Sequence, residues 1–481
     1  MFSWRVKTVE QLLAEKEEGT HRLKKILGPF DLTALGLGAI IGMGVFVLTG
    51  VAAALYAGPG VIFSFVVAGL ASGLAALVYA ELAAAVPVAG SAYTFAYATF
   101  GEFTAWLVGW NLVLEYVVAA GAVSIGWSGY FVSLLQSAGI NIPPHLTSSP
   151  FAGGVVNLPA MIIAILVTTL IISGTQHSAV ANKLIVALKV GVLLLFIILG
   201  ARHVDPGNWV PFLPFGIPGI FHGAAIIFFA FIGFDAVSTA AEEVKNPRRD
   251  LPVGIIASLA LATLLYVSVA VVLTGMVRYP LLNNPSPMAY ALLSAGLRWG
   301  SALTAVGALA GLTSVMLVTM YGQSRIFFAM SRDGLLPPIF SWVHPRLKTP
   351  VPDSLFIGAV VTVIGALLPI QIVAELANIG TLTAFMAVSG GHLILRRTRP
   401  DLPRPFKVPA SPWIPLASLG ASLYLAFNLP PLTWLRMLIW VALGTVVYFV
   451  YGYSQSKLKG MEKAVAHPFS APARKPEKGR K

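Results

Sequence analysis

The chain has 481 residues, of which 57% are hydrophobic and only 11% are charged. Soluble globular domains carry roughly 25% charged residues, so the composition excludes an ordinary soluble protein. There is no cysteine, which excludes disulfides, thiol catalysis and cysteine-ligated metals. The net charge of +13 needs an explanation of its own.

Apolar runs of membrane-spanning length, ~20 residues each, recur from residue 32 to residue 452. They predict an all-α polytopic membrane protein with a polar segment before the first span (1–31) and a basic tail after the last (455–481). The twelve expected spans are 32–55, 61–86, 103–134, 159–172, 184–200, 217–241, 252–276, 299–330, 353–369, 371–395, 411–429 and 434–454.

An even number of spans puts both termini on one side, and most of the 32 Lys and Arg residues then share that side. The positive-inside rule assigns it to the cytoplasm. Attraction of the basic tail to anionic membrane lipid explains the net charge better than nucleic acid does. The sequence has no N-glycosylation triplet, and we expect a bacterial plasma-membrane protein.

The first span carries glycines at 36, 38, 42 and 44. Each glycine inside a helix costs roughly 1 kcal/mol relative to alanine. The pair Gly42 and Gly44 therefore predicts a helix that stops and restarts in mid-membrane. The freed backbone groups must then face protein, water or ligand. Close packing of helices on small residues is the alternative.

Two charged residues lie inside other predicted spans. Glu115, in span three, is a functional candidate because carboxylates are costly within a membrane; a structural hydrogen bond to Asn111 or to a neighbouring helix is the alternative. Lys189, in span five, follows Lys183 by six residues, about 9 Å of helix. Its side chain reaches roughly 6 Å, so snorkelling to the interface only partly explains it.

A second break is predicted in span six, where Gly233 and Asp235 interrupt an aromatic run. The pairs Ile41-Gly42 and Ile232-Gly233 fall five spans apart. Broken helices at matching places in two halves are typical of transporters built from inverted repeats. A kinked packing helix with a buried, satisfied Asp235 is the alternative.

Four motifs together resemble the amino acid–polyamine–organocation transporter superfamily, in its cationic amino acid transporter branch. They are Gly38–Phe46, Tyr79–Leu82 followed by Pro87 and Gly90–Tyr93, Phe229–Asp235 continuing into Glu242–Pro252, and Arg325 followed by Ala329–Pro337. The resemblance covers roughly residues 30–400. It implies the leucine-transporter fold: inverted five-helix repeats at 32–200 and 217–395, discontinuous first and sixth helices, and two peripheral helices at 411–454. It also implies transport of free amino acids.

The breaks suit an amino acid zwitterion. The N–H groups of Gly42, Met43 and Gly44 begin a half-helix, whose positive end favours the carboxylate. Unwound carbonyls near Ile40, Phe229 and Ile232 can accept from the ammonium. Phe229 or Phe231 is expected to close over the substrate, although core packing is an alternative for either. The full set of expected substrate contacts is Ile40, Ile41, Gly42, Met43, Gly44, Glu115, Phe229, Ala230, Phe231, Ile232, Thr319 and Met320.

The resemblance identifies Lys189 with the lysine that replaces sodium in proton-coupled relatives. We therefore expect a proton symporter that imports amino acids by alternating access, with no enzyme activity, metal, other cofactor or sodium requirement. The apolar stretch around Thr319 and Met320 favours small neutral substrates such as alanine, whereas the branch suggests lysine, arginine and ornithine. An exchanger of the same fold, a channel and a membrane enzyme are the alternatives.

Gate candidates at the cytoplasmic ends of spans six to eight are Glu242, Glu243, Arg248, Arg249 and Arg325. The expected partners are the free amino acid and membrane lipid, and we expect no nucleic acid; the sequence does not identify a protein partner.

Overall fold

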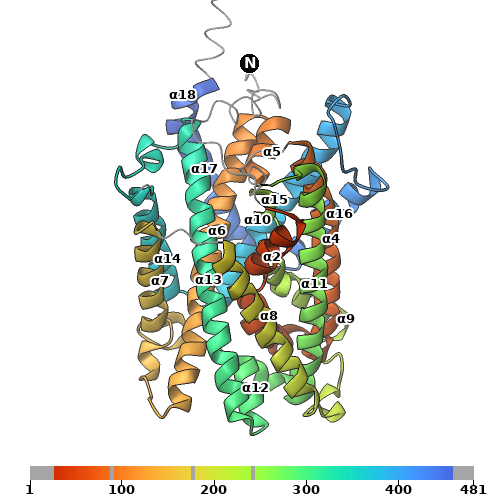
Figure 1. Cartoon of the computed structure of the whole chain (residues 1–481), viewed down its shortest axis with the longest axis vertical. Helices are drawn as coiled ribbons and strands as arrows, with labels where there is room; N and C mark the ends of the chain where they lie inside the picture. Colours follow the sequence, from red (N-terminus) through yellow and green to blue (C-terminus); the bar gives the residue numbers. More distant parts are fainter. Residues whose placement is uncertain (1–26, 87–90, 175–178, 240–243, 348, 459–481) are drawn as a thin grey trace, which may run out of the picture.

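The computed structural model shows a bundle of helices that run mostly along one axis (Figure 1). The description is confined to residues 27–86, 91–174, 179–239, 244–347 and 349–458. This part contains helices, turns and two isolated bridges but no strand of a sheet. One bridge joins Leu27 to Val244, and near the other chain end the N–H of Lys457 donates to the carbonyl of Asp333. Both described chain ends lie at the top of Figure 1, which we call the terminal side.

Among the described residues, seven helical segments are long and apolar enough to cross a membrane on their own. They are Gly44–Ala85 (η1 Gly44–Leu48, α3 Thr49–Ala52, η2 Ala53–Ala57, η3 Gly58–Gly60 and α4 Val61–Ala85), α6 (Glu102–Ser137), α8 (Ala179–Ala201), α11 (Pro247–Met276), α13 (Arg298–Arg332), α15 (Ile370–Thr398) and α17 (Pro431–Val447) with its continuation through η11 (Tyr448–Gly452) and α18 (Tyr453–Gln455).

Five further apolar helices are shorter: α2 (Pro29–Ile40), α7 (Leu158–Ile172), α9 (Gly216–Ile227) continued by η7 (Phe228–Phe231), α14 (Val351–Leu367) and α16 (Trp413–Phe427). Each predicted span overlaps one of these helices. Because only seven segments are of full spanning length by themselves, twelve crossings remain a prediction. The short connecting helices are α5 (Ser91–Thr99), α10 (Ala236–Thr239) and α12 (Pro287–Ser294).

Both predicted breaks are present. Helix α2 begins at Pro29, a residue suited to the first helical position, and ends at Ile40; Ile41 is extended, and a new helix follows at Gly44. In the second broken segment Ile232 is extended and Gly233 has a φ of +112°. Such a φ is accessible at low cost only to glycine. Helix α10 then starts at Ala236.

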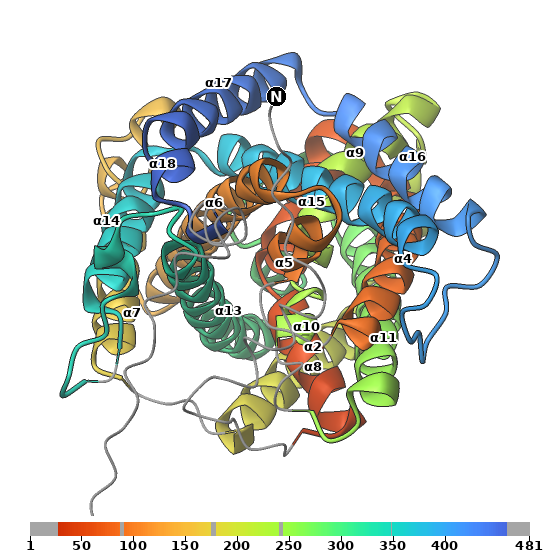
Figure 2. The same cartoon turned by 90° about the horizontal axis from the view of Figure 1, so that it is seen from above.

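Viewed from the terminal side, α2 and α10 lie near the centre of the bundle (Figure 2). Helices α4, α6, α8, α11, α13 and α15 surround them, and α7 with α14, α16 and α17 form the periphery. The main pairings are α6 with α13 and α15, α4 with α11, and α7 with α14. The broken helices are thus enclosed by the long ones, which keeps their unpaired backbone groups away from lipid.

Candidate substrate and coupling site

The two breaks cross each other in the middle of the bundle. A Cβ added to Gly44 would lie 2.2 Å from the Cα of Ala230, and one added to Gly233 would lie 3.0 Å from the carbonyl carbon of Ala39. Glycine is therefore required at both positions for close contact between the broken segments. The side of Gly44 where a Cβ would stand is filled by Ala230, so the glycine allows the two segments to pack there. The contact of its N–H with a substrate carboxylate stays a prediction.

Side chains from distant helices satisfy the carbonyl groups at the end of α2. The Tyr266 hydroxyl donates to the Ile40 carbonyl over 2.9 Å, and the Lys189 Nζ donates to the Gly38 carbonyl over 2.7 Å. We expected the Ile40 carbonyl to accept a hydrogen bond from a substrate ammonium. In this structure it already accepts one from Tyr266. A carbonyl oxygen has a second lone pair, so the position is not closed to a ligand.

The end of α9 is satisfied in a similar way. The Asn378 side-chain amide of α15 donates to the carbonyls of Ala225 and Ile226 over 2.8 and 2.9 Å. The Phe229 carbonyl, another expected ammonium acceptor, takes the N–H of Ile232 over 3.2 Å. Sequence reasoning found neither Asn378 nor Tyr266, because each lies in a span that has no break of its own.

Lys189 is completely buried and lies between α2 and α13. Besides its hydrogen bond to Gly38, its aliphatic stem packs on Gly311 of α13, where an added Cβ would lie 3.1 Å from the lysine Cγ. The first, fifth and eighth predicted spans therefore meet at this side chain. Its Nζ has no carboxylate partner among the described residues.

The two candidate aromatic lids have different surroundings. Phe231 is fully buried and its ring packs edge-on against Phe65 and Tyr266, with centroids 6.3 and 5.6 Å apart. Phe231 therefore packs in the core, which was the alternative to a role as a lid over the substrate. Phe229 is 6% exposed and takes part in no ring pair among the described aromatic residues. It is therefore the better lid candidate.

Helix α13 supplies the expected side-chain end of the site. A Cβ on Gly42 would lie 3.1 Å from Cγ2 of Val315, so this helix lies directly against the first break. Met320 is 2% exposed, and the Thr319 hydroxyl donates to the Val315 carbonyl over 2.8 Å. Because that hydroxyl is engaged in its own helix, this face of α13 is mainly apolar.

Glu115 is buried on α6 beside Gly380 of α15, where an added Cβ would lie 3.3 Å from the glutamate Cβ. Its Oε2 and the Oδ1 of Asn111 each lack a hydrogen-bond partner in the described part of the chain. No hydrogen bond joins Glu115 to Asn111 in the described part of the chain, so that structural alternative is not seen here. Asp235 is also buried, and its carboxylate accepts from the Ser91 hydroxyl over 3.2 Å.

Three of the expected gate residues, Arg248, Arg249 and Arg325, are described by the structure, and none of them forms an ion pair with another described residue. Glu242 and Glu243 lie outside the described residues. The Arg325 guanidinium lies 4.6 Å above the ring of Tyr321, one turn away on the same helix, and donates to its hydroxyl over 3.2 Å. Arg248 and Arg249 are exposed at the start of α11.

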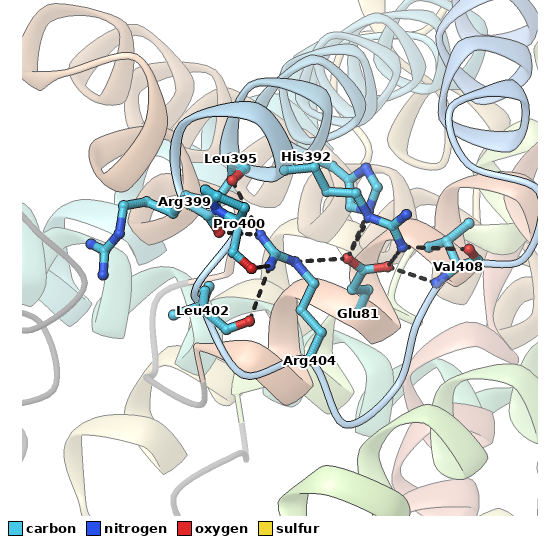
Figure 3. A network of polar contacts seen from close by, with 9 residues as sticks. Glu81, His392, Leu395, Arg399, Pro400, Leu402, Arg404 and Val408 are labelled. Carbon is cyan, nitrogen blue, oxygen red and sulfur yellow. Dashed lines mark hydrogen bonds and ion pairs between the residues drawn. The ribbon is translucent and has the colours of Figure 1, made fainter.

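Two other polar contacts join helices on the terminal side, and sequence reasoning missed both. Lys183 of α8 pairs with Asp31 of α2 over 2.5 Å. Figure 3 shows the second, in which the buried Glu81 carboxylate of α4 meets Arg396 and His392 of α15 and Arg404 of the following loop, at 2.6, 3.1 and 3.3 Å. Glu81 belongs to the motif Tyr79–Leu82. Its partners lie more than 300 residues away and belong to no sequence motif that would reveal the contact.

Comparison with known proteins agrees with this architecture. Residues 27–456 match the family model described as amino acid permease. Over 95% of the chain, the sequence is 49% identical to a branched-chain amino acid permease (BcaP) and 46% identical to a methylthioribose transporter, both of Bacillus subtilis, covering 98% and 99% of those proteins. It is 38% identical to the vacuolar cationic amino acid transporter 4 of Arabidopsis thaliana over 82% of this chain and 67% of that one.

These relatives are transporters, which confirms the resemblance to the amino acid–polyamine–organocation superfamily and the expectation that the chain is not an enzyme. The family match spans nearly all of the described helices, including both breaks. The chain belongs to the amino acid permease family.

Proposed function

We propose that this protein is a proton-coupled symporter that imports free amino acids through the bacterial plasma membrane by alternating access. We propose further that its described helices form the leucine-transporter fold with twelve crossings and cytoplasmic termini. Two broken helices that cross at glycines, in matching halves of the chain, support the fold. The distribution of basic residues supports the orientation.

The observation that carries the coupling proposal is the placement of Lys189. When charged, its ammonium makes a charge-assisted hydrogen bond to Gly38, while its aliphatic stem packs on Gly311. Such bonds are roughly twice as strong as neutral ones. Loss of the proton would weaken the attachment of α2 to α8, and α2 would then be free to move. One proton per cycle would thus be linked to opening on the terminal side.

For the substrate we propose a neutral amino acid with a small or branched aliphatic side chain. The N–H groups of Gly42 and Met43 are placed to receive the carboxylate, and the unwound carbonyls nearby to receive the ammonium. The apolar face of α13 at Val315 and Met320 would accept the side chain. A relative named as a branched-chain amino acid permease is in keeping with this proposal. Glu115 would be the point where a cationic side chain could be accommodated instead.

Uptake into proteoliposomes tests the proposal. With acid outside and no sodium, radiolabelled alanine or leucine should accumulate above the external concentration, and a protonophore should abolish that accumulation. A sodium requirement would contradict the coupling mechanism. Counter-flow without any pH dependence would identify an exchanger. A screen of the common amino acids by thermal stabilisation would rank the substrates independently of coupling.

A further inference from the structure

A cavity of about 570 Å³ opens on the terminal side of the molecule, away from the two breaks. It lies between the end of α4, the beginning of α11 and the loop between α15 and α16. Its lining residues are Ala84, Ala85, Asn246, Pro247, Arg248, Arg249, Leu402 and Pro403. Helices α4 and α11 lie side by side at one edge of the bundle (Figure 2), so the cavity is at the boundary between protein, lipid and water.

The charged groups of the cavity are cationic. Arg248 and Arg249 make no ion pair or hydrogen bond through their guanidinium groups with the described residues. They stand in the first turn of a 30-residue helix, whose N-terminus adds positive potential. Two acids close by in the described part of the chain are engaged elsewhere: Asp250 accepts the N–H of Asn246, and Asp401 pairs with Arg399. Two unpaired guanidiniums beside a concave surface suit a phosphate group.

An exposed apolar stripe runs from this cavity toward the middle of α11. Val253, Ile256 and Leu264 are 44%, 37% and 65% exposed. They follow Arg249 at helical spacings that keep all four residues on one face. A cationic end that continues into an apolar face matches the headgroup and acyl chains of a phospholipid. A soluble phosphate would use only the cationic end.

The opposite wall of the cavity is held firmly. Arg404 donates to the carbonyls of Leu402 and Arg399 over 3.0 and 2.8 Å while it contacts Glu81 (Figure 3). The loop that carries Leu402 and Pro403 is therefore tied to the end of α4. This leaves a preformed recess between that loop and α11.

We propose that this cavity binds the headgroup of an anionic phospholipid, with the phosphate on Arg248 and Arg249 and the acyl chains along Val253, Ile256 and Leu264. A lipid seated there would touch α4, α11 and the loop before α16 together. The cavity lining contains neither Lys189 nor any residue of the two breaks, so the lipid site does not depend on the coupling mechanism, although Arg248 and Arg249 were also gate candidates.

Native mass spectrometry of the purified full-length chain tests the site. Phosphatidylglycerol should bind in preference to phosphatidylcholine, and R248A/R249A should weaken that binding on the order of tenfold or more. R397A is the matched control, because Arg397 is exposed near the terminal-side end of α15 but does not line the cavity; it should bind as the parent does. R248K/R249K should keep most of the preference, since the charges remain.

Three outcomes would overturn the proposal. Equal binding of the two lipids, or unchanged phosphatidylglycerol binding by R248A/R249A, would exclude recognition of an anionic headgroup by these arginines. Competition by glycerol phosphate or inorganic phosphate at concentrations similar to those of the lipid would identify a soluble-anion site. If R248A/R249A does not fold, a photoactivatable phosphatidylglycerol on the parent protein decides the matter: cross-links at 246–249 or 402–403 support the site, and cross-links only elsewhere exclude it.

Discussion

The ends of the two broken helices, α2 and α9, are satisfied by chemically different groups. At the end of α2, the donors are the Tyr266 hydroxyl and the Lys189 ammonium. At the end of α9, both bonds come from the neutral amide of Asn378. An amide keeps the same donors at every pH near neutrality, whereas a lysine can lose a proton.

This difference suggests a division of labour between the halves. The hydrogen bonds from Asn378 to the end of α9 do not depend on pH. They are suited to holding that segment in place throughout a transport cycle. The donors at the end of α2 include Lys189, whose charge can change, so the position of α2 can depend on the protonation of that lysine. The inverted repeat would then be symmetric in backbone but asymmetric in chemistry. The predictions below test that asymmetry.

The largest effect is expected at Lys189. One proton moving through ~100 mV supplies about 2.3 kcal/mol, enough for roughly fifty-fold accumulation of a neutral substrate. In proteoliposomes with acid outside, K189A should lose this accumulation, because no ammonium remains to release a proton. K189R should also lose it, since a guanidinium keeps its proton throughout the working range.

The matched control is K183R, because Lys183 lies on the same helix and pairs with Asp31 at the surface. It should accumulate substrate as the parent does. Substrate-induced thermal stabilisation should persist in K189R, which separates coupling from binding. Full accumulation by K189R would show that α2 and α9 do not differ in the way proposed.

A smaller effect, on stability and not on coupling, is expected at Asn378. N378L removes both donors and leaves the carbonyls of Ala225 and Ile226 buried without them. Each unsatisfied acceptor costs about 1–3 kcal/mol. The midpoint of thermal unfolding should fall by the same amount at acid and neutral pH, and any surviving transport should remain proton-driven. A pH-dependent loss would argue against a constant cap.

Gly44 tests the crossing itself. G44V places a branched side chain against the backbone of Ala230, and overpacking of this kind typically costs about 1–3 kcal/mol. We expect lower yield and thermal stability, with loss of transport. G191V is the control, since an added Cβ at Gly191 on α8 meets no atom within 4 Å. Normal stability of G44V together with loss of substrate binding alone would restore the ligand-approach interpretation.

The sequence predicted the breaks because glycine pairs and a buried aspartate are local features. It also located Lys189, whose depth follows from its distance along the helix from Lys183. The capping side chains could not be predicted, because Tyr266 and Asn378 are ordinary polar residues in long spans whose partners are set by the packing of the helices. The contact of Gly44 with Ala230 could not be predicted for the same reason, since the two residues lie 186 positions apart.

Selectivity should respond to the apolar face of α13. M320S shortens a buried side chain on the helix that contacts the first break through Val315, and it should admit longer cationic substrates. Competition by arginine against alanine uptake should improve by about tenfold, the factor that corresponds to ~1.4 kcal/mol. T319A is the control, because the Thr319 hydroxyl is bonded within its own helix. An unchanged profile in M320S would move the side-chain end of the site toward Glu115.

The smallest effect is expected where α2 and α8 meet at the surface. The Lys183–Asp31 pair is exposed on the lysine side, and such pairs contribute about 0.2–1 kcal/mol. Because the parent has no cysteine, a single A34C in α2 can report how far this helix opens toward the terminal side. D31N and K183Q should each raise its labelling by a maleimide up to about fivefold. The exchanged pair D31K/K183D should return it toward the parent value. Equal labelling in all four proteins would show that this surface pair has no part in the opening of α2.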